Sequence, residues 1–180
     1  MKKVIVFLAE GFEEIEAISI IDVLRRAEIA VTTVSIGKEK EVKGAHNVPV
    51  VADKLFEEVD FANYHMLVLP GGMPGAKNLN EHEGVKKQVE AFEKDKHVGA
   101  ICAAPMILGG MGLLKGKRAT SYPGFEAELI EATITNEAVT VDGNITTGKG
   151  PAFAMQFALQ LVETLAGKAT RDEVSNGLLL

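Results

Sequence analysis

The chain has 180 residues, of which 47% are hydrophobic, and carries 19 basic against 25 acidic side chains, for a formal net charge of −6. This length is enough to bury one sizeable core, so we expect a single domain over residues 1–180. The acidic balance, the lack of a basic cluster and the absence of tryptophan argue against nucleic acid as a specific ligand. No apolar stretch approaches the length of a membrane span, and the single cysteine, Cys102, cannot form an internal disulfide. These features predict a cytoplasmic protein in a reducing compartment.

The first part of the chain is predicted to form a strand, a helix and a second strand. Residues 4–8 (VIVFL) form an uninterrupted apolar run, which is typical of a strand buried on both faces. Gly11 ends this run, and apolar residues then recur at helical spacing over 13–27, with two arginines in the last turn. A second strand is predicted at 31–36. The two strands are therefore expected to be parallel and joined by a right-handed crossover.

The remaining elements continue this alternation. Residues 38–53 predict a short hairpin outside the main sheet, with Pro49 at an edge. Further buried strands are predicted at 66–69 and 98–101, helices at 80–95, 103–110, 152–166 and 171–177, and short strands at 118–121, 133–135, 139–142 and 145–147. The alternation indicates an α/β three-layer sandwich, a Rossmann-like architecture in which helices cover both faces of a mostly parallel sheet.

The most informative stretch surrounds Cys102. A short apolar strand ends directly at this residue, and a helix of small and aliphatic residues follows it. A nucleophile held at such a sharp turn, a nucleophile elbow, needs small neighbours two positions to either side, and Ala100 and Ala104 meet this need. The N–H groups and the dipole of the following helix also favour a thiolate. The alternative is an ordinary buried cysteine, since free cysteine is among the most buried residue types.

Three predicted strands end in segments that suit a ligand site. They end at Leu8, Leu69 and Ile101. Ligands of such sheets bind outside the carboxyl ends of parallel strands, so we expect the three following loops to converge. Gly71 and Gly72, with the amide of Ala103, are expected to form an oxyanion pocket that faces Cys102. A double glycine after a strand is also common simply because it turns the chain.

Three glutamates, Glu13, Glu14 and Glu16, lie in the first turns of the first predicted helix. Carboxylates are usual at a helix start, because they interact favourably with the helix dipole. Alternatively, one of them reaches the sulfur of Cys102, where a carboxylic acid with a raised pKa donates to a thiolate or moves a proton. Spacing alone does not choose among the three.

The histidines are informative mainly by their positions. A cysteine hydrolase needs a histidine within hydrogen-bonding reach of the sulfur. His65 and His97 immediately precede strands and so belong to the opposite edge of the sheet, while His82 lies near the start of a surface helix. His46, in the predicted hairpin, is the only candidate. Since no ligand-type residues show a spacing that also converges, no metal site is expected.

Four segments occur in a characteristic order: AEGFEEIEA (9–17), LPGG (69–72), AICAAP (100–105) and TGKGP (147–151). Together they resemble the signature segments of the ThiJ/PfpI superfamily, and within it the branch of the Parkinson-disease-associated protein deglycase and its bacterial ThiJ-like relatives. The resemblance runs from residue 3 to residue 167. It implies a flavodoxin-like fold, a homodimer and no cofactor.

The resemblance also implies roles for individual residues. Cys102 corresponds to the reactive cysteine at the elbow, Glu16 to its partner glutamate, and Gly71 and Gly72 to the oxyanion loop, with Ala103 beside it. Members of this branch are described as glyoxalases or deglycases that act on methylglyoxal and its adducts. They are also described as oxidative-stress sensors and chaperones that act through cysteine oxidation, and PfpI-type relatives have been called intracellular proteases.

Two positions depart from the pattern of the relatives. Many of them place a histidine before a proline after the elbow helix, and Tyr122 stands there in this chain. A tyrosine is a poor base near neutral pH, which weakens the protease interpretation. His46 occupies a position at which some relatives carry an arginine supplied by the other subunit. We therefore expect His46 to contact a small anion or carbonyl.

The leading hypothesis is a cofactor-free, glyoxalase-like enzyme. The Cys102 thiolate attacks an α-oxoaldehyde such as methylglyoxal, or a protein or nucleotide adduct of one, and Glu16 acts as the acid and base. The first alternative is an oxidative-stress sensor or redox-regulated chaperone that acts through oxidation of Cys102. The second and weaker alternative is a PfpI-like hydrolase.

Overall fold

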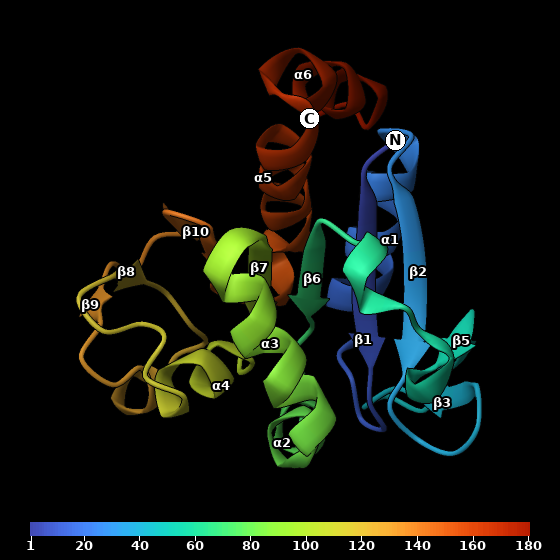
Figure 1. The fold of residues 1–180 in the computed structure, drawn as a ribbon. Coiled ribbons are helices and arrows are strands. Elements are labelled where there is room, and N and C mark those ends of the chain that lie inside the picture. Colours follow the sequence, from blue (N-terminus) through green and yellow to red (C-terminus); the bar gives the residue numbers. More distant parts are fainter.

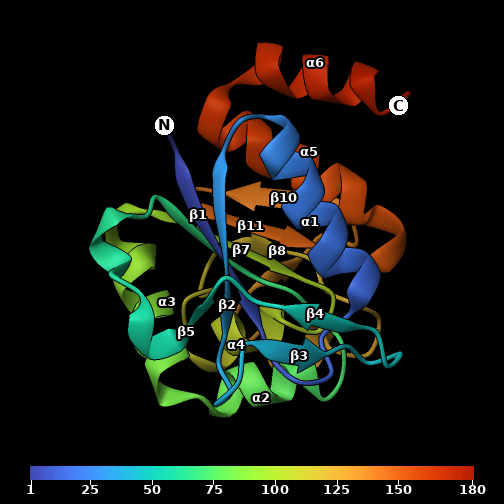
Figure 2. The same ribbon diagram turned by 90° about the vertical axis from the view of Figure 1, so that its right-hand side faces the viewer.

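The computed structural model describes all of residues 1–180 and contains a central seven-stranded sheet with helices on both faces (Figures 1 and 2). Its strands are β1 (Lys3–Leu8), β2 (Ala30–Ser35), β5 (Lys54–Leu55), β6 (Met66–Leu69), β7 (His97–Ile101), β10 (Val139–Asp142) and β11 (Ile145–Gly148). Their order across the sheet is β10-β11-β7-β6-β1-β2-β5, and all neighbours are parallel except β10 and β11. The predicted α/β sandwich with a mostly parallel sheet is confirmed.

Six α-helices and two small sheets surround this sheet. The helices are α1 (Glu14–Arg26), α2 (Gly75–Glu81), α3 (Glu83–Asp95), α4 (Pro105–Gly110), α5 (Ala154–Ala166) and α6 (Lys168–Gly177). Helices α1 and α5 pack together on one face, α6 packs on α5, and α3 packs against β6 and β7 on the other face (Figure 2). The small sheets are the antiparallel hairpin β3 (Glu41–Lys43) and β4 (Pro49–Val51), and the parallel pair β8 (Arg118–Ala119) and β9 (Thr133–Ile134). The hairpin expected outside the main sheet is therefore confirmed.

The central strands are buried because their sequences are apolar on both faces. Residues 4–8 of β1 are fully buried, as are all residues of β6. Helix α1 turns Ile20 and Leu24 into the same core, while its opposite face leaves Ile15 and Ile18 exposed to solvent. One apolar core thus fixes β1, β6, β7 and the start of α1 relative to one another.

The structure differs from the sequence-based prediction in several places: the last helix begins at Lys168 rather than at residue 171, the strand predicted at 118–121 covers only Arg118–Ala119, and three further differences follow. The helix predicted at 80–95 is two helices, because His82 has an extended backbone (ψ 102°) and its ring accepts a hydrogen bond from the Val85 N–H at 3.1 Å. The helix after the elbow begins at Pro105 rather than at residue 103. Strand β5 was not predicted, because two residues are too few to show a periodic pattern.

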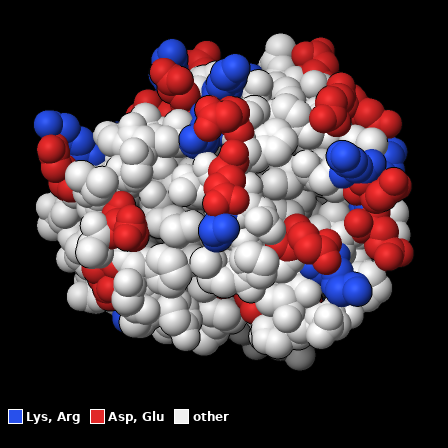
Figure 3. Space-filling view, turned by 90° about the horizontal axis from the view of Figure 1, so that it is seen from below, with Lys and Arg blue, Asp and Glu red and all other residues white.

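The carboxyl ends of β1, β6 and β7 lie side by side at one edge of the sheet, at the lower end of Figure 1. This confirms that the three loops identified in the sequence converge. Viewed from that end, acidic and basic side chains are interspersed over part of the surface and a broad area carries no charge (Figure 3). None of the helices is long and apolar enough to cross a membrane.

Candidate active site

Cys102 follows β7 at a strained turn. Its φ of 65° lies in the left-handed region, which residues other than glycine seldom adopt. The Cys102 N–H donates to the carbonyl of Gly148 at 2.9 Å, and the Cys102 carbonyl accepts from the Tyr122 N–H at 2.8 Å. Such strain costs on the order of 1–3 kcal/mol and persists only where the surroundings enforce it. The sharp turn predicted from the small neighbouring residues is confirmed, and it leaves Cys102 8% exposed.

Glu16 is the glutamate that the fold brings to Cys102. It lies in the first turn of α1, is fully buried, and its carboxyl group faces the Cys102 thiol. Its Oε2 accepts a hydrogen bond from the Gly71 N–H at 2.8 Å, and its Oε1 has no hydrogen-bond partner. Glu13 and Glu14 point elsewhere, toward His46. The structure therefore makes the choice among the three glutamates that spacing left open.

Gly71 brings the two side chains together. A Cβ atom at this position would lie 2.6 Å from the Cys102 Cβ, 2.8 Å from the Glu16 Oε2 and 3.0 Å from the Cys102 Sγ. Side-chain atoms do not tolerate contacts this short, so Glu16 and Cys102 can meet here only because residue 71 has no side chain. This close approach is the reason for a glycine at position 71.

The substitution Gly71→Ala is expected to destabilise the fold and disturb the site together. The new methyl group forces Cys102 or Glu16 to move, and overpacking of this kind costs about 1–3 kcal/mol. Gly110→Ala is the matched control, because a Cβ there meets nothing within 4 Å in helix α4. Urea unfolding of both variants measures the difference. Equal midpoints for the two variants would contradict the packing described above.

Two backbone amides face the sulfur. The N–H groups of Gly72 and Ala103 lie near the Cys102 thiol and act to lower its pKa. Gly72 has a φ of 87°, and a Cβ there would lie 2.4 Å from the Glu13 nitrogen, so a glycine is needed at this position as well. The arrangement differs from the expected oxyanion pocket in one respect, because the Gly71 N–H donates to Glu16 instead of facing the sulfur.

Burial controls the ionisation of the Cys102–Glu16 pair. Burial raises the pKa of Glu16 to about 7, and hydrogen bonds with Cys102 and Gly71 offset only part of this effect. Burial, together with the neighbouring Glu16, raises the pKa of Cys102 to about 12, although the amides of Gly72 and Ala103 act to lower it. The sequence indicated that the N–H groups and the dipole of the helix after Cys102 favour a thiolate, but in the folded protein burial of the thiol outweighs the amides. The two groups titrate as a coupled pair, in which a thiolate forms when Glu16 takes up the proton.

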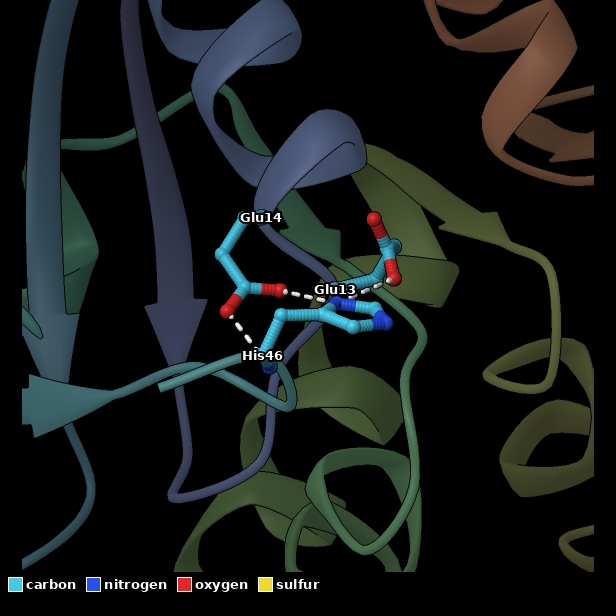
Figure 4. Close-up of side chains that lie close together, drawn as sticks. All are labelled: Glu13, Glu14 and His46. Atoms are coloured by element: carbon cyan, nitrogen blue, oxygen red, sulfur yellow. Dashed lines mark hydrogen bonds and ion pairs between the residues drawn. The ribbon is translucent and has the colours of Figure 1, made fainter. Parts of the chain in front are cut away.

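His46 lies in the turn between β3 and β4, where glutamates of the α1 start hold it (Figure 4). Its Nδ1 is 2.9 Å from Glu14 Oε2 and 3.7 Å from Glu13 Oε2. Hydrogen bonding to Glu14 raises the pKa of His46. Contrary to the sequence-based interpretation, potential ligand groups do converge here. The sequence did not reveal them, because 32 residues separate Glu14 from His46 and the docking of the hairpin is a tertiary event.

The other three histidines lie away from Cys102. His65 and His97 are at the amino-terminal ends of β6 and β7, where the His97 N–H donates to the His65 carbonyl at 3.1 Å. His82 caps helix α3. Their positions agree with those predicted from the sequence.

Tyr122 borders the elbow on its solvent side. It is 46% exposed and lines an apolar cavity of about 160 Å³ together with Pro123 and residues 149–153. The Tyr122 N–H also donates to the Cys102 carbonyl, so Tyr122 connects the elbow to this cavity, although Cys102 does not itself line it. A larger cavity, of about 530 Å³, lies between the end of α1 and helix α6, and neither cysteine nor histidine lines it.

The mostly parallel sheet presents a cysteine on a strained elbow, beside a buried glutamate and two backbone amides without other partners. These features define a class of α/β proteins that carry a cysteine nucleophile at the elbow. The flavodoxin-like sheet order and the register of the four signature segments narrow this class further. The chain belongs to the DJ-1/PfpI family, whose sequence profile matches residues 2–164.

Several relatives show how far the likeness extends. The chain is 39% identical to Protein DJ-1 homolog A of Arabidopsis thaliana over 99% of its own length and 47% of that protein, so it spans about half the length of this relative. It is 33% identical to the glutathione-independent glyoxalase DJ-1 of Schizosaccharomyces pombe, over 99% of this chain and 98% of the relative. It is 34% identical to a deglycase of Pyrococcus abyssi, over 91% of this chain and 99% of the relative.

Solved structures share the fold closely. The structure of oxidized Toxoplasma gondii DJ-1 superposes with a TM-score of 0.95 at 36% identity, covering 99% of this chain and 98% of the other.

Proposed function

We propose that this protein is a cofactor-free glyoxalase or deglycase that acts on methylglyoxal-like α-oxoaldehydes or on their adducts. The observation that carries this proposal is the buried pair of Glu16 and Cys102, in which burial raises the pKa of Glu16 to about 7. A carboxyl group with a pKa near the working pH can both accept and return a proton. The names of two relatives, a glyoxalase and a deglycase, support the same reaction class.

In the proposed first step, the Cys102 proton passes to Glu16 and the sulfur forms a bond to the aldehyde carbon. The C=O π electrons move to oxygen, and the amides of Gly72 and Ala103 stabilise the resulting oxyanion. Glu16 protonates this oxygen, which gives a hemithioacetal. The negative charge on the substrate oxygen is therefore stabilised by the two amides until Glu16 protonates that oxygen.

In the second step, Glu16 removes the hydrogen of the former aldehyde carbon as a proton, the freed electron pair forms a C=C bond, and the ketone oxygen takes up the negative charge of the enediolate. The hemithioacetal hydroxyl then gives its proton to this former ketone oxygen, and Glu16 returns its proton to the neighbouring carbon, which leaves a thioester of lactate on Cys102. Water then attacks the thioester carbonyl, the C–S bond breaks, and lactate and the free thiol are released. The aldehyde carbon is oxidised and the ketone carbon is reduced, so no external oxidant is needed.

Two further residues complete the proposed site. Tyr122 lines the apolar cavity beside the elbow, where we propose that it contacts the alkyl part of the substrate. The Nδ1 of His46 is engaged by Glu14, so a contact from His46 to a substrate carboxylate or carbonyl uses its other ring nitrogen, Nε2.

The test is the conversion of methylglyoxal by the purified protein in the absence of glutathione, followed by proton NMR. We expect lactate to form in the amount in which methylglyoxal disappears. Simple trapping of the aldehyde by lysine and arginine side chains consumes methylglyoxal without forming lactate, and that result would contradict the proposal. Protein unfolded by heat is the control for such trapping.

Oxidation of Cys102 is a second candidate function, as a stress sensor or as the switch of a chaperone. A Glu16 that is partly protonated near neutral pH can donate a hydrogen bond to an oxygen on the oxidised sulfur. Mild peroxide is expected to add two oxygen atoms to Cys102, measured by intact mass, and to raise the melting temperature. An unmodified Cys102 in folded protein, under conditions that oxidise it in urea, would exclude this function.

We also propose a homodimer in a cytoplasmic setting. Ile15 and Ile18 on α1 and Val48 and Val51 on or beside the hairpin are large apolar side chains that are 45–69% exposed. Helix α1 and the hairpin lie on the same side of the molecule (Figure 2), and the Val48 N–H donates to Glu14 at the start of α1. We propose that a second copy covers these apolar side chains. Light scattering is expected to give twice the mass of one chain. The mass of a single chain at micromolar concentration would contradict the dimer.

A further inference from the structure

The cluster of Glu13, Glu14 and His46 has a geometry that the proposed reaction does not use. The two glutamates come from the start of α1, and His46 comes from the turn of the β3–β4 hairpin. Figure 4 shows one oxygen of each carboxylate directed toward the same ring nitrogen, the Nδ1 of His46. The distances from that nitrogen are 2.9 Å to Glu14 Oε2 and 3.7 Å to Glu13 Oε2.

Backbone amides fix the orientation of both carboxylates. The Oε1 of Glu14 accepts hydrogen bonds from the N–H groups of His46, at 2.7 Å, and Val48, at 3.4 Å. The Oε1 of Glu13 accepts from the Ile15 N–H at 3.1 Å. In each carboxylate the oxygen held by an amide is therefore Oε1, and Oε2 is the one presented to His46. Fixing of ligand groups by such outer hydrogen bonds is typical of metal sites.

Glu13 supplies a second observation that favours a cation. Its side chain is only 10% exposed, and its Oε2, which accepts no hydrogen bond, has the His46 Nδ1 at 3.7 Å as its ion-pair neighbour. A carboxylate with so little exposure is poorly solvated, and a bound cation would compensate for the lost solvation.

We propose that Glu13, Glu14 and His46 bind one divalent first-row transition metal ion, of which Zn²⁺ is the representative. Zinc binds imidazole nitrogen and carboxylate oxygen at about 2.0–2.2 Å, which places neighbouring ligand atoms of a tetrahedral site about 3.4 Å apart. The observed 2.9 and 3.7 Å differ from this spacing by amounts that side-chain rotation supplies. Because the His46 side chain is 73% exposed, water can take the fourth position.

This cluster uses other ligand atoms than the Cys102–Glu16 pair but lies near it. The Glu13 N–H donates to the Gly71 carbonyl at 3.0 Å, and the Gly71 N–H donates to Glu16. A thiol and a carboxylate also bind zinc, however, and Cys102 must be removed as a ligand before the cluster is tested.

The test is titration calorimetry with Zn²⁺ on the full-length Cys102→Ser protein. We expect one ion per chain, and we expect His46→Ala and Glu13→Gln, each added to Cys102→Ser, to weaken binding by about ten-fold or more. His82→Asn is the matched control, because it removes a histidine elsewhere but keeps a side chain that can cap α3; it is expected to bind as the parent does.

Circular dichroism checks that the variants are folded. We expect His46→Ala to fold, because the His46 side chain is largely exposed. An unchanged affinity in folded His46→Ala would overturn the proposal. So would the absence of saturable binding by the Cys102→Ser parent at millimolar zinc.

Discussion

Replacing Cys102 by alanine is expected to reduce lactate formation from methylglyoxal by on the order of a thousand-fold or more, because no other group at the elbow can form the carbon–sulfur bond. The fold should persist, since alanine adopts the left-handed φ of 65° no less readily than cysteine does. Lactate measured by NMR at several protein concentrations gives the rate. The circular dichroism spectrum should match that of the wild type.

Cys102→Ser is the companion to this variant. It keeps the size and hydrogen-bonding capacity of the side chain but replaces the thiol by a hydroxyl, which is a far weaker acid and nucleophile. We expect it to be as inactive as Cys102→Ala. Wild-type rates of lactate formation in both variants would mean that the reaction occurs elsewhere on the protein.

Replacing Glu16 by glutamine is expected to lower the rate by about 10²–10⁴-fold, the range associated with loss of a general acid–base group. A glutamine carbonyl still accepts the hydrogen bond from the Gly71 N–H, so the loop should keep its position. In the wild type, Glu16 can accept the Cys102 proton only when the Cys102–Glu16 pair has already lost one proton. The value of kcat/KM should therefore fall as the pH drops below about 7. The glutamine variant should lose this inflection, and a wild-type pH profile in the variant would exclude Glu16 as the acid and base.

The same substitution should stabilise the protein above neutral pH. Burial raises the pKa of Glu16 from its ordinary value of 4.5 to about 7, so the folded state binds this proton more tightly than the unfolded state. The contribution of Glu16 to the free energy of unfolding therefore falls as the pH rises from about 4.5 through 7 and is constant above that, a loss of about 3 kcal/mol.

Glu16→Gln removes this loss, so urea unfolding at pH 8 should give a higher midpoint than for the wild type. Glu90→Gln is the control, because the Glu90 side chain is 60% exposed on α3 and its substitution should change little. A glutamine variant less stable than the wild type at pH 8 would show that the buried carboxylate has a stabilising partner.

The strands that carry the site and the turn at Cys102 could be predicted from the sequence, because both depend on local patterns. The uninterrupted apolar runs of β1, β6 and β7 predicted parallel buried strands, and parallel strands must end at the same edge. The small residues around Cys102 predicted the strained turn. Both features are encoded within a few neighbouring positions.

Other features depend on burial and docking that no local pattern contains. The raised pKa of Cys102 comes from desolvation by the surrounding fold, which outweighs the helix-start amides that the sequence does show. Glu16 was indistinguishable by spacing from Glu13 and Glu14, because only the packing of α1 on the sheet decides which carboxylate faces Cys102. The contact of His46 with α1 likewise forms only when the hairpin docks.

Both chain ends lie at the end of the molecule opposite the elbow, although Figure 2 shows them well apart from each other (Figures 1 and 2). A further domain or a second copy of the fold, joined through either end, would therefore extend away from Cys102 and leave the approach to the sulfur open. The Arabidopsis relative, about twice as long as the matching region, shows that this family includes such longer chains. For work on this protein, affinity tags and fluorescent fusions can be placed at either terminus without obstructing the site.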